Sequence, residues 1–320
     1  MSRQNPEQGN VYQVLRKQGY GLVGRHSAVK LCHWLRKSLR DEGTCYKEKF
    51  YGIRSHRCLQ MSPCVAFCNF KCVFCWRPVD LTESTSMGED VDDPDLIASK
   101  SIEAQRRLVS GYGGVPDMVE RARFEEALEP KHAAISLAGE PTLYPELGGL
   151  ISAYHRMGMT TFLVSNGSRP DALGSLTEQP TQLYISLSAF DETSHFRVNR
   201  PSVPGTWESL QRSLELLGSM DCRTVIRVTM VKGLNMFHAE DYARMIERAS
   251  PDFVEVKAYM YVGWSRYRLE MENMPRFREI KGFAEEISRE SGYGLLDEFR
   301  PSRVVLLSAS KRDSTIRGLE

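Results

Sequence analysis

Short runs of β-branched and other apolar residues alternate along this chain with longer amphipathic stretches. Short apolar runs are typical of buried strands, whereas apolar residues repeated every three or four positions are typical of helices. We predict strands at Met61–Phe67, Ala133–Leu137, Thr160–Val164, Gln182–Leu187, Arg223–Val231 and Asp252–Lys257. We predict helices between them at Pro94–Gly111, Tyr144–Met157, Trp207–Ser219 and Ala239–Arg248.

The alternation of strands and helices predicts an α/β fold. Repeated strand–helix units build a parallel sheet with helices outside it, and six of them fit an incomplete (β/α)6 TIM-like barrel. We expect residues 61–300 to form this barrel, after a basic, cysteine-containing N-terminal extension of residues 1–60. A C-terminal strand, within Arg300–Leu307, and a tail should occupy residues 301–320. Ligands of such barrels bind at the carboxyl ends of the strands.

The composition indicates a globular chain and gives no sign of a membrane protein. Among 320 residues, 41% are hydrophobic, which is enough for a sizeable core. No run of about 18 uncharged apolar residues is found, and the first residues lack the apolar core of a signal peptide. We therefore expect a cytoplasmic protein without a membrane segment.

The most specific chemistry lies in the cysteines, of which seven of eight fall between positions 32 and 75. Cys68, Cys72 and Cys75 place three thiols within eight residues. Three thiolates would ligate a [4Fe–4S] cluster and leave one iron open to a small molecule. A structural zinc site is the alternative, but it normally has four ligands in two pairs, and no His follows at the expected distance.

The spacing Cys-x3-Cys-x2-Cys, with aromatic Phe74 before the last Cys, resembles the cluster loop of radical S-adenosylmethionine (SAM) enzymes. The resemblance implies that SAM binds the open iron and that its reductive cleavage gives a 5′-deoxyadenosyl radical. It also implies SAM contacts at the ends of the next three strands. The residues concerned are Gly139 and Glu140, then Ser165 and Asn166, then Ser186 and Ser188.

A second cysteine series, Cys32, Cys45 and Cys58, has a regular spacing of thirteen residues. These residues could be buried small side chains. A set of three also suits a second [4Fe–4S] cluster with one open iron. Lys47 stands two residues after the middle cysteine.

The stretch Cys45–Ile53, together with Ser136–Thr142 and Glu255–Gly263, resembles the archaeal members of the 4-demethylwyosine synthase family of tRNA wybutosine formation. The resemblance implies a carbon–carbon lyase that converts N1-methylguanosine beside the anticodon of tRNA(Phe), with pyruvate, into 4-demethylwyosine. It implies that the second cluster binds pyruvate and that Lys47 forms a Schiff base with it. Lys47 could instead contact phosphate. The expected partners are a tRNA anticodon stem-loop, pyruvate and an external one-electron donor such as a flavodoxin or ferredoxin, and the protein should be a monomer.

The charge is uneven along the chain. Residues 1–60 carry twelve Lys or Arg and four Asp or Glu, although the whole chain has a net charge of +1. Such a basic region is typical of a protein that holds a polyanion, or it is merely a solvated surface.

Two other functions remain open from the sequence. One is a different two-cluster radical SAM enzyme that acts on a peptide or small molecule and needs no tRNA. The other is a non-catalytic iron–sulfur RNA-binding protein, which would ligate each metal fully and would not cleave SAM.

Overall fold

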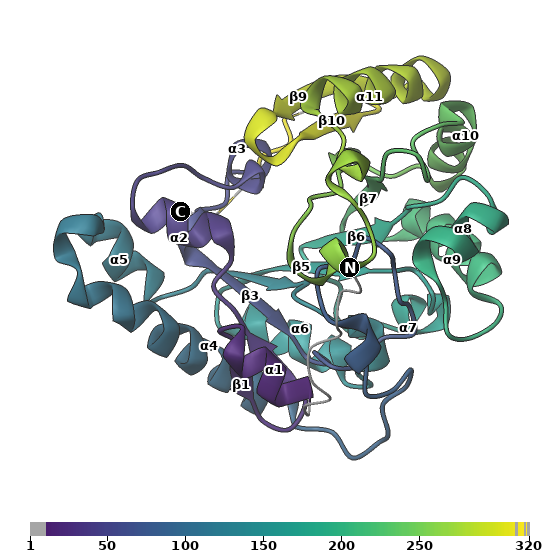
Figure 1. Cartoon of the computed structure of the whole chain (residues 1–320). Coiled ribbons are helices and arrows are strands. Elements are labelled where there is room, and N and C mark those ends of the chain that lie inside the picture. The colour runs from purple at the N-terminus through teal and green to yellow at the C-terminus, as the bar shows by residue number, and fades with distance from the viewer. Residues whose placement is uncertain (1–10, 311–312, 317, 319–320) are drawn as a thin grey trace, which may run out of the picture.

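Ten strands form one continuous sheet in the residues that the computed structural model describes, which are 11–310, 313–316 and 318 (Figure 1). Residues 1–10 of the predicted N-terminal extension and residues 311–312, 317 and 319–320 of the predicted tail lie outside the described residues. In chain order the strands are β1 Gly21–Val23, β2 Ser27–Val29, β3 Cys58–Ser62, β4 His132–Ile135, β5 Thr160–Ser165, β6 Gln182–Ser186, β7 Arg223–Met230, β8 Phe253–Ala258, β9 Gly294–Phe299 and β10 Val304–Ser308.

The six strands from β3 to β8 pair in sequence order and in parallel, as predicted. Antiparallel strands extend the sheet at both ends, with the β1–β2 hairpin beside β3, and β10 followed by β9 beside β8. Within the described part of the chain no pairing joins β1 to β9, so the barrel is open. The structure thus confirms an incomplete (β/α)6 barrel.

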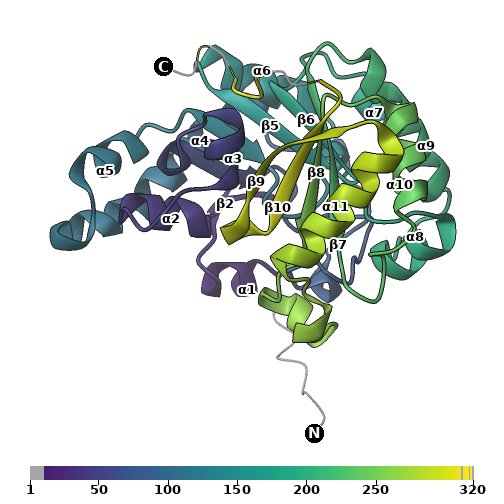
Figure 2. The same ribbon diagram turned by 90° about the horizontal axis from the view of Figure 1, so that it is seen from above.

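Helices cover the outer face of this sheet (Figure 2). In chain order the helices of the described residues are α1 Val11–Lys17, α2 His33–Leu39, α3 Tyr46–Tyr51, α4 Pro94–Ser110, α5 Arg121–Ala127, α6 Leu147–Arg156, α7 Pro170–Gly174, α8 Glu192–Asn199, α9 Thr206–Leu216, α10 Ala239–Ala249 and α11 Phe277–Ser291. The short helices α2 and α3 do not lie on the outer face. They lie in the gap between the N-terminal hairpin and the C-terminal strands (Figures 1 and 2). No helix in the described residues is both long and apolar enough to cross a membrane.

The period of two along each strand decides which side chains face the helices and which face the barrel interior. Leu163, Leu183 and Ile226 pack with the helices in the main hydrophobic core. Phe162 and Tyr184, one position away, pack instead with Tyr46 and Tyr51 of α3. The interior side of the sheet therefore meets α3, and residues at the same parity on β7 and β8 point toward it.

The C-terminal residues return to the same helix. The Ile316 N–H donates to the Tyr51 carbonyl at 3.0 Å, and Ser314 Oγ donates to the Phe50 carbonyl at 2.5 Å. Arg223 of β7 donates through Nη2 to the Ser314 carbonyl at 2.5 Å. Residues 314–316 thereby hold α3 against the open side of the barrel.

Some predicted boundaries were wrong. The strand predicted at Met61–Phe67 is β3, Cys58–Ser62, which ends before Pro63 because proline has no N–H for the sheet ladder. The predicted terminal strand begins at Val304, since Arg300–Ser302 forms a 3-10 turn. The sequence analysis did not find β1, β2 or β9.

Candidate active site

The first cysteine triad lies in the loop after β3, at the carboxyl end of the parallel strands. Burial raises the pKa of the Cys68 thiol to about 11, with the Cys75 sulfur among the groups that raise it and the Arg77 charge opposing them. Burial and the neighbouring Cys75 and Cys68 sulfurs also raise the pKa of Cys72. Each thiol therefore lies within electrostatic reach of the others, in surroundings where a bound cation would replace its proton.

A site for an iron–sulfur cluster and a site for a single zinc ion differ in the number of their ligands and in the distances between the ligand atoms. Two sulfurs on one tetrahedral zinc lie about 3.8 Å apart, given a zinc–sulfur bond of about 2.3 Å. Within the described residues, only His238, Glu240 and Asp241 form a group of ligand atoms all within 4.8 Å of one another. Neither cysteine triad is among the compact groups, and each triad offers three thiols, one fewer than the four ligands of a structural zinc site.

Arginines brace the first cysteine loop. Arg268, which follows the loop after β8, donates through Nε to the Val73 carbonyl at 3.2 Å and through Nη2 to the Cys75 carbonyl. Arg77 is buried and donates to the Phe70 carbonyl at 3.3 Å. Positive charge beside the thiols stabilises their ionised form. The sequence analysis missed Arg268, because nothing local marks a residue so far along the chain.

Gly139 allows the chain after β4 to approach the cysteine loop closely. Its φ is 75°, and a Cβ there would lie 2.0 Å from the Cys64 carbonyl oxygen and 2.6 Å from that of Phe67. The Glu140 N–H donates to the Phe67 carbonyl at 2.9 Å, and Cys64 Sγ donates to the Glu140 carbonyl at 3.0 Å. Cys64 is therefore fully buried, and its thiol is bonded within the packed strand end.

The Glu140 carboxylate joins the ends of β4 and β5. It accepts from Thr142 N at 3.1 Å and Thr142 Oγ1 at 2.7 Å. It also accepts from Ser165 Oγ at 2.8 Å and Asn166 N at 2.7 Å. Burial raises the pKa of Glu140, while these donors favour its ionised form. Three of these donors meet Oε1 and only Asn166 N meets Oε2, so among the described residues Oε2 keeps one acceptor position for a ligand. The structure thus brings Gly139, Glu140, Ser165 and Asn166 together.

The two serines predicted at the third strand end lie in the same region. Ser186 ends β6 and is half-buried. Ser188 is buried, and its Oγ finds no hydrogen-bond partner among the described residues. The Ser188 carbonyl accepts from Asn235 Nδ2 at 2.8 Å. A buried hydroxyl without a partner is costly unless a ligand satisfies it, so Ser188 Oγ fits a polar cofactor at this mouth.

The second triad gathers where the N-terminal extension meets the barrel. Cys32 precedes α2 and accepts from Leu35 N at 3.3 Å, Cys45 precedes α3, and Cys58 begins β3. Burial and then the Cys32 sulfur raise the pKa of both Cys45, to about 12, and Cys58. Three segments spaced along the sequence thus bring these thiols into mutual reach.

Lys47 lies in the first turn of α3 and is 8% exposed. Its Nζ lies 4.4 Å from the ring centre of Phe162 and 4.5 Å from that of Tyr184, on the interior faces of β5 and β6. Burial and then the Arg227 charge lower the pKa of Lys47 to about 8, against the opposing pull of Glu255, Cys58 and Cys45. A substantial fraction of this amine is therefore neutral near pH 8.

A buried charge network surrounds this lysine. Glu255 of β8 accepts from Tyr46 Oη at 3.0 Å, from Tyr51 Oη at 2.8 Å and from Arg227 Nε at 3.0 Å. Arg227 also donates through Nη2 to Tyr46 Oη at 2.8 Å. The network fixes the two tyrosines of α3 to strands β7 and β8.

Lys257 is a second interior amine, two residues beyond Glu255. Its Nζ donates to the Ser302 carbonyl at 2.9 Å and lies 5.1 Å from the Tyr46 ring centre. Burial and then the Arg227 charge lower the pKa of Lys257 to about 8. No role was predicted for Arg227, Glu255 or Lys257, although charged residues at alternate positions of the predicted strands β7 and β8 indicate side chains that face the barrel interior.

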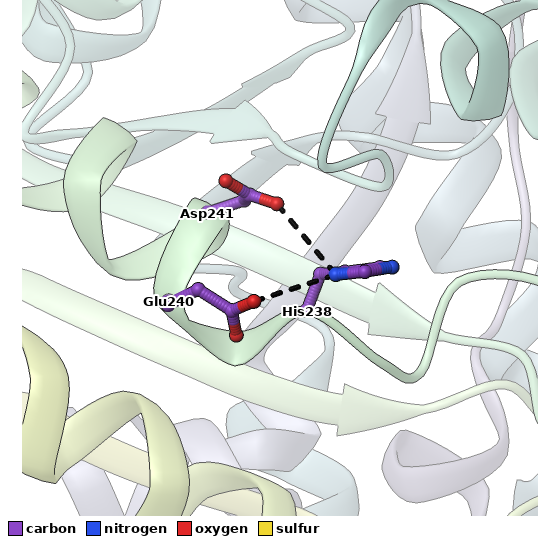
Figure 3. Close-up of side chains that lie close together, drawn as sticks. All are labelled: His238, Glu240 and Asp241. Carbon is purple, nitrogen blue, oxygen red and sulfur yellow. Dashed lines mark hydrogen bonds and ion pairs between the residues drawn. The ribbon is translucent and has the colours of Figure 1, made fainter.

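The one compact group of potential ligands among the described residues is exposed at the start of α10 (Figure 3). His238 Nδ1 lies 3.4 Å from a Glu240 oxygen and 3.9 Å from an Asp241 oxygen. Both acids lie in the first turn, where the positive end of the helix dipole stabilises carboxylates. We assign no metal to it.

Comparison with protein families gives two matches that together span the barrel. Residues 62–246 match the radical SAM superfamily, and residues 248–309 match the family described as wyosine base formation. Among curated proteins, an S-adenosyl-L-methionine-dependent tRNA 4-demethylwyosine synthase from Pyrococcus abyssi is 52% identical over 301 residues, covering 93% of this chain and 88% of that protein. The synthase of Methanocaldococcus jannaschii is 43% identical and covers 94% of this chain and 96% of that protein.

Solved structures agree with these relatives. A structure of TYW1 with a lysine–pyruvate adduct bound superimposes with a TM-score of 0.88 at 41% identity, covering 98% of this chain and 100% of that chain. A crystal structure of archaeal TYW1 superimposes with a TM-score of 0.80 at 38% identity and the same coverage.

Proposed function

The chain belongs to the family of S-adenosyl-L-methionine-dependent tRNA 4-demethylwyosine synthases, and from this premise we propose that it converts N1-methylguanosine beside the anticodon of tRNA(Phe), with pyruvate, into 4-demethylwyosine. It is a radical SAM enzyme, so it uses SAM and a [4Fe–4S] cluster. The observation that carries the proposal is the buried, partly neutral amine of Lys47 beside a second thiol triad.

Cys68, Cys72 and Cys75 would hold the cluster that meets SAM. With SAM bound, reductive cleavage there supplies a 5′-deoxyadenosyl radical that takes hydrogen from the N-methyl group of the target base. The strand ends supply the cofactor contacts: carbonyls beside Gly139 for the SAM ammonium, and the hydroxyls of Ser186 and Ser188 for other polar groups. The Glu140 carboxylate joins β4 to β5 and, because Oε2 accepts only from Asn166 N, it could also accept from the SAM ammonium.

Cys32, Cys45 and Cys58 would hold a second [4Fe–4S] cluster with one open iron for pyruvate. Support comes from their mutual reach and from the proximity of Cys45 and Cys58 to Lys47. The donor set is all thiol, which suits iron–sulfur clusters.

Lys47 is the residue proposed to bind pyruvate covalently. Its neutral amine would attack the keto carbon, form a carbon–nitrogen double bond and release water. Burial supplies the neutral amine, as is usual for lysine nucleophiles. The rings of Phe162 and Tyr184 shield it from bulk water, which argues against the alternative that Lys47 contacts an RNA phosphate.

The remaining expectations are also proposals. We infer that an external one-electron donor such as a flavodoxin or ferredoxin delivers the electron. We infer a monomer in the cytoplasm, where the clustered thiols would stay reduced.

One assay tests the function. The anaerobically reconstituted protein should be incubated with dithionite, SAM, pyruvate and tRNA bearing N1-methylguanosine, and the digested tRNA analysed by nucleoside mass spectrometry. We expect the tricyclic nucleoside, dependent on pyruvate. SAM cleavage with unchanged tRNA would favour a radical SAM enzyme with another substrate, and RNA binding without SAM cleavage would favour a non-catalytic iron–sulfur protein.

A further inference from the structure

We propose that a pocket between the cysteine loop and the loop after β8 binds one unpaired nucleotide of the RNA, next to the base that reacts. The pocket has a volume of about 350 Å³ and is lined by Gln18, Lys30, Trp76, Trp264, Arg266 and Tyr267. We call it the aromatic pocket. The proposal rests on the proposed function and names a subsite for its substrate.

The pocket combines flat rings with cations. Trp264 and Tyr267 have ring centres 5.4 Å apart, and Tyr267 is 51% exposed. Trp76, which also lines the pocket, stacks on Tyr20, with ring centres 6.2 Å apart and planes 16° apart. Lys30 Nζ lies 4.4 Å from the Tyr20 ring centre and 5.4 Å from that of Trp76. Aromatic rings that stack on bases, beside cations that meet phosphates, are the features of single-stranded RNA sites.

The pocket is fixed to the cysteine loop by the backbone. The Trp264 N–H donates to the Trp76 carbonyl at 3.0 Å, and Trp76 follows Cys75 directly. Gly263 has φ of 59°, and a Cβ there would lie 2.4 Å from the Trp76 carbonyl oxygen. A nucleotide in the pocket would therefore lie beside the loop proposed to hold the SAM cluster.

The lining of the aromatic pocket carries positive charge, which favours RNA over a peptide as its ligand. Lys30 and Arg266 are the charged residues of the lining, and none of the described residues that line it is a carboxylate. Arg16 and Lys17 are exposed at the end of α1, just before Gln18. A cationic rim around stacked rings suits a base with its flanking phosphates.

Binding of an anticodon stem-loop oligoribonucleotide tests the proposal. 2-Aminopurine should replace each loop base in turn, and its fluorescence should be titrated against the reconstituted enzyme. We expect one loop position, beside the modified base, to be quenched by the wild type. Trp264→Ala and Tyr267→Ala should each weaken binding by about 5- to 150-fold and abolish that quenching, whereas Trp264→Phe should retain most of the affinity.

Matched controls make the result decisive. Met157→Ala removes an exposed apolar side chain at the end of α6, on the amino-terminal side of the strands, and should bind like the wild type. Both aromatic variants should keep the iron content and the RNA-independent SAM cleavage. The Trp264 backbone bond survives truncation of its side chain. If Trp264→Ala nevertheless reduces the iron content, the binding measurement on Tyr267→Ala decides whether the aromatic pocket binds RNA. The exposed ring of Tyr267 can be removed without that risk.

Two results would overturn the proposal: wild-type affinity in both alanine variants, or quenching that persists in them. Failure of the proposed function has a separate signature, since a wild type that makes no tricyclic nucleoside can still bind the stem-loop through this pocket.

Discussion

At the scale of single residues, the interior of the barrel combines an aromatic cluster with a set of interacting charged side chains. Lys47, Lys257 and Arg227 face a single carboxylate, Glu255, which is fully buried. The role of Lys47 was predicted from the resemblance of the stretch Cys45–Ile53 to a known family. Glu255 and Lys257 lie in the stretch Glu255–Gly263 of the same resemblance, which gave them no role, and Arg227 lies in none of these stretches. Their association depends on the pairing of β7 with β8 and on the docking of α3.

The first prediction concerns the amine of Lys47. Lys47→Arg keeps a positive charge but cannot form an imine, so product should be lost while both clusters and uncoupled SAM cleavage remain. Borohydride with labelled pyruvate should trap an adduct on the Lys47 peptide of the wild type and not of the variant, as read by mass spectrometry. Near wild-type product from Lys47→Arg would falsify the Schiff-base role.

The second prediction concerns Glu255. Glu255→Gln leaves the half-buried Arg227 and the buried Lys47 without their counter-charge, so the free energy of unfolding should fall by about 3–5 kcal/mol. Asp95→Asn, which removes an exposed partner of Arg156, is the matched control and should cost less than about 1 kcal/mol. Urea unfolding measures both, and equal losses would contradict a special role for the buried network.

At the scale of elements, the cysteine loop is positioned by contacts with strand ends and not by its own secondary structure. Parallel strands β4 to β8 were predicted within a few residues because burial on both faces gives continuous apolar runs. The missed β1 and β2 have three residues each and β9 lies at an edge of the sheet, so that signal is absent there, whereas β3 was displaced because Pro63 ends it early. Their identity depends on partners far along the chain.

The third prediction tests the close approach at Gly139. Gly139→Ala should push the cysteine loop away, because a Cβ would collide with the Cys64 and Phe67 carbonyls. Iron content after reconstitution should fall, and SAM cleavage with it. Gly158→Ala shares a positive φ of 69° but has nothing within 4 Å of the new Cβ, so it should keep its iron.

The fourth prediction separates the two cysteine triads. Reconstitution should load about eight irons per chain, as two cubane clusters. Cys72→Ser should lose about half the iron and all SAM cleavage, whereas Cys45→Ser should lose about half the iron and retain uncoupled cleavage. An iron assay and chromatography of 5′-deoxyadenosine measure both quantities. Four irons in the wild type would rule out the second cluster.

At the scale of the whole molecule, the basic N-terminal extension is partly neutralised by distant acids. Arg25 pairs with Asp90 and Asp92, and Lys49 pairs with Asp297. Arg54 pairs with Glu126. The excess of Lys and Arg in residues 1–60 therefore overstates the positive potential at the protein surface. The sequence could not reveal this, because the paired acids lie in other segments.

The fifth prediction follows from the cations left exposed. Arg16, Lys17 and Arg36 are exposed and have no ion pair within the described residues. Affinity for tRNA should fall steeply with salt. Changing these three to Gln should reduce the slope of log K against log salt by about one for each phosphate that the variant no longer neutralises. An unchanged slope would assign RNA binding to other surfaces.

The hydrogen bonds from residues 314–316 to α3 also bear on the order in which the parts of the protein fold. During synthesis the helix bearing Lys47 emerges early, yet the Ser314 hydroxyl that holds it is added 264 residues later. Such long-range closure is slow and comes last in folding. We therefore expect Cys32, Cys45 and Cys58 to stay accessible to the proteins that deliver iron and sulfide until the C-terminal residues are made and α3 is held in place.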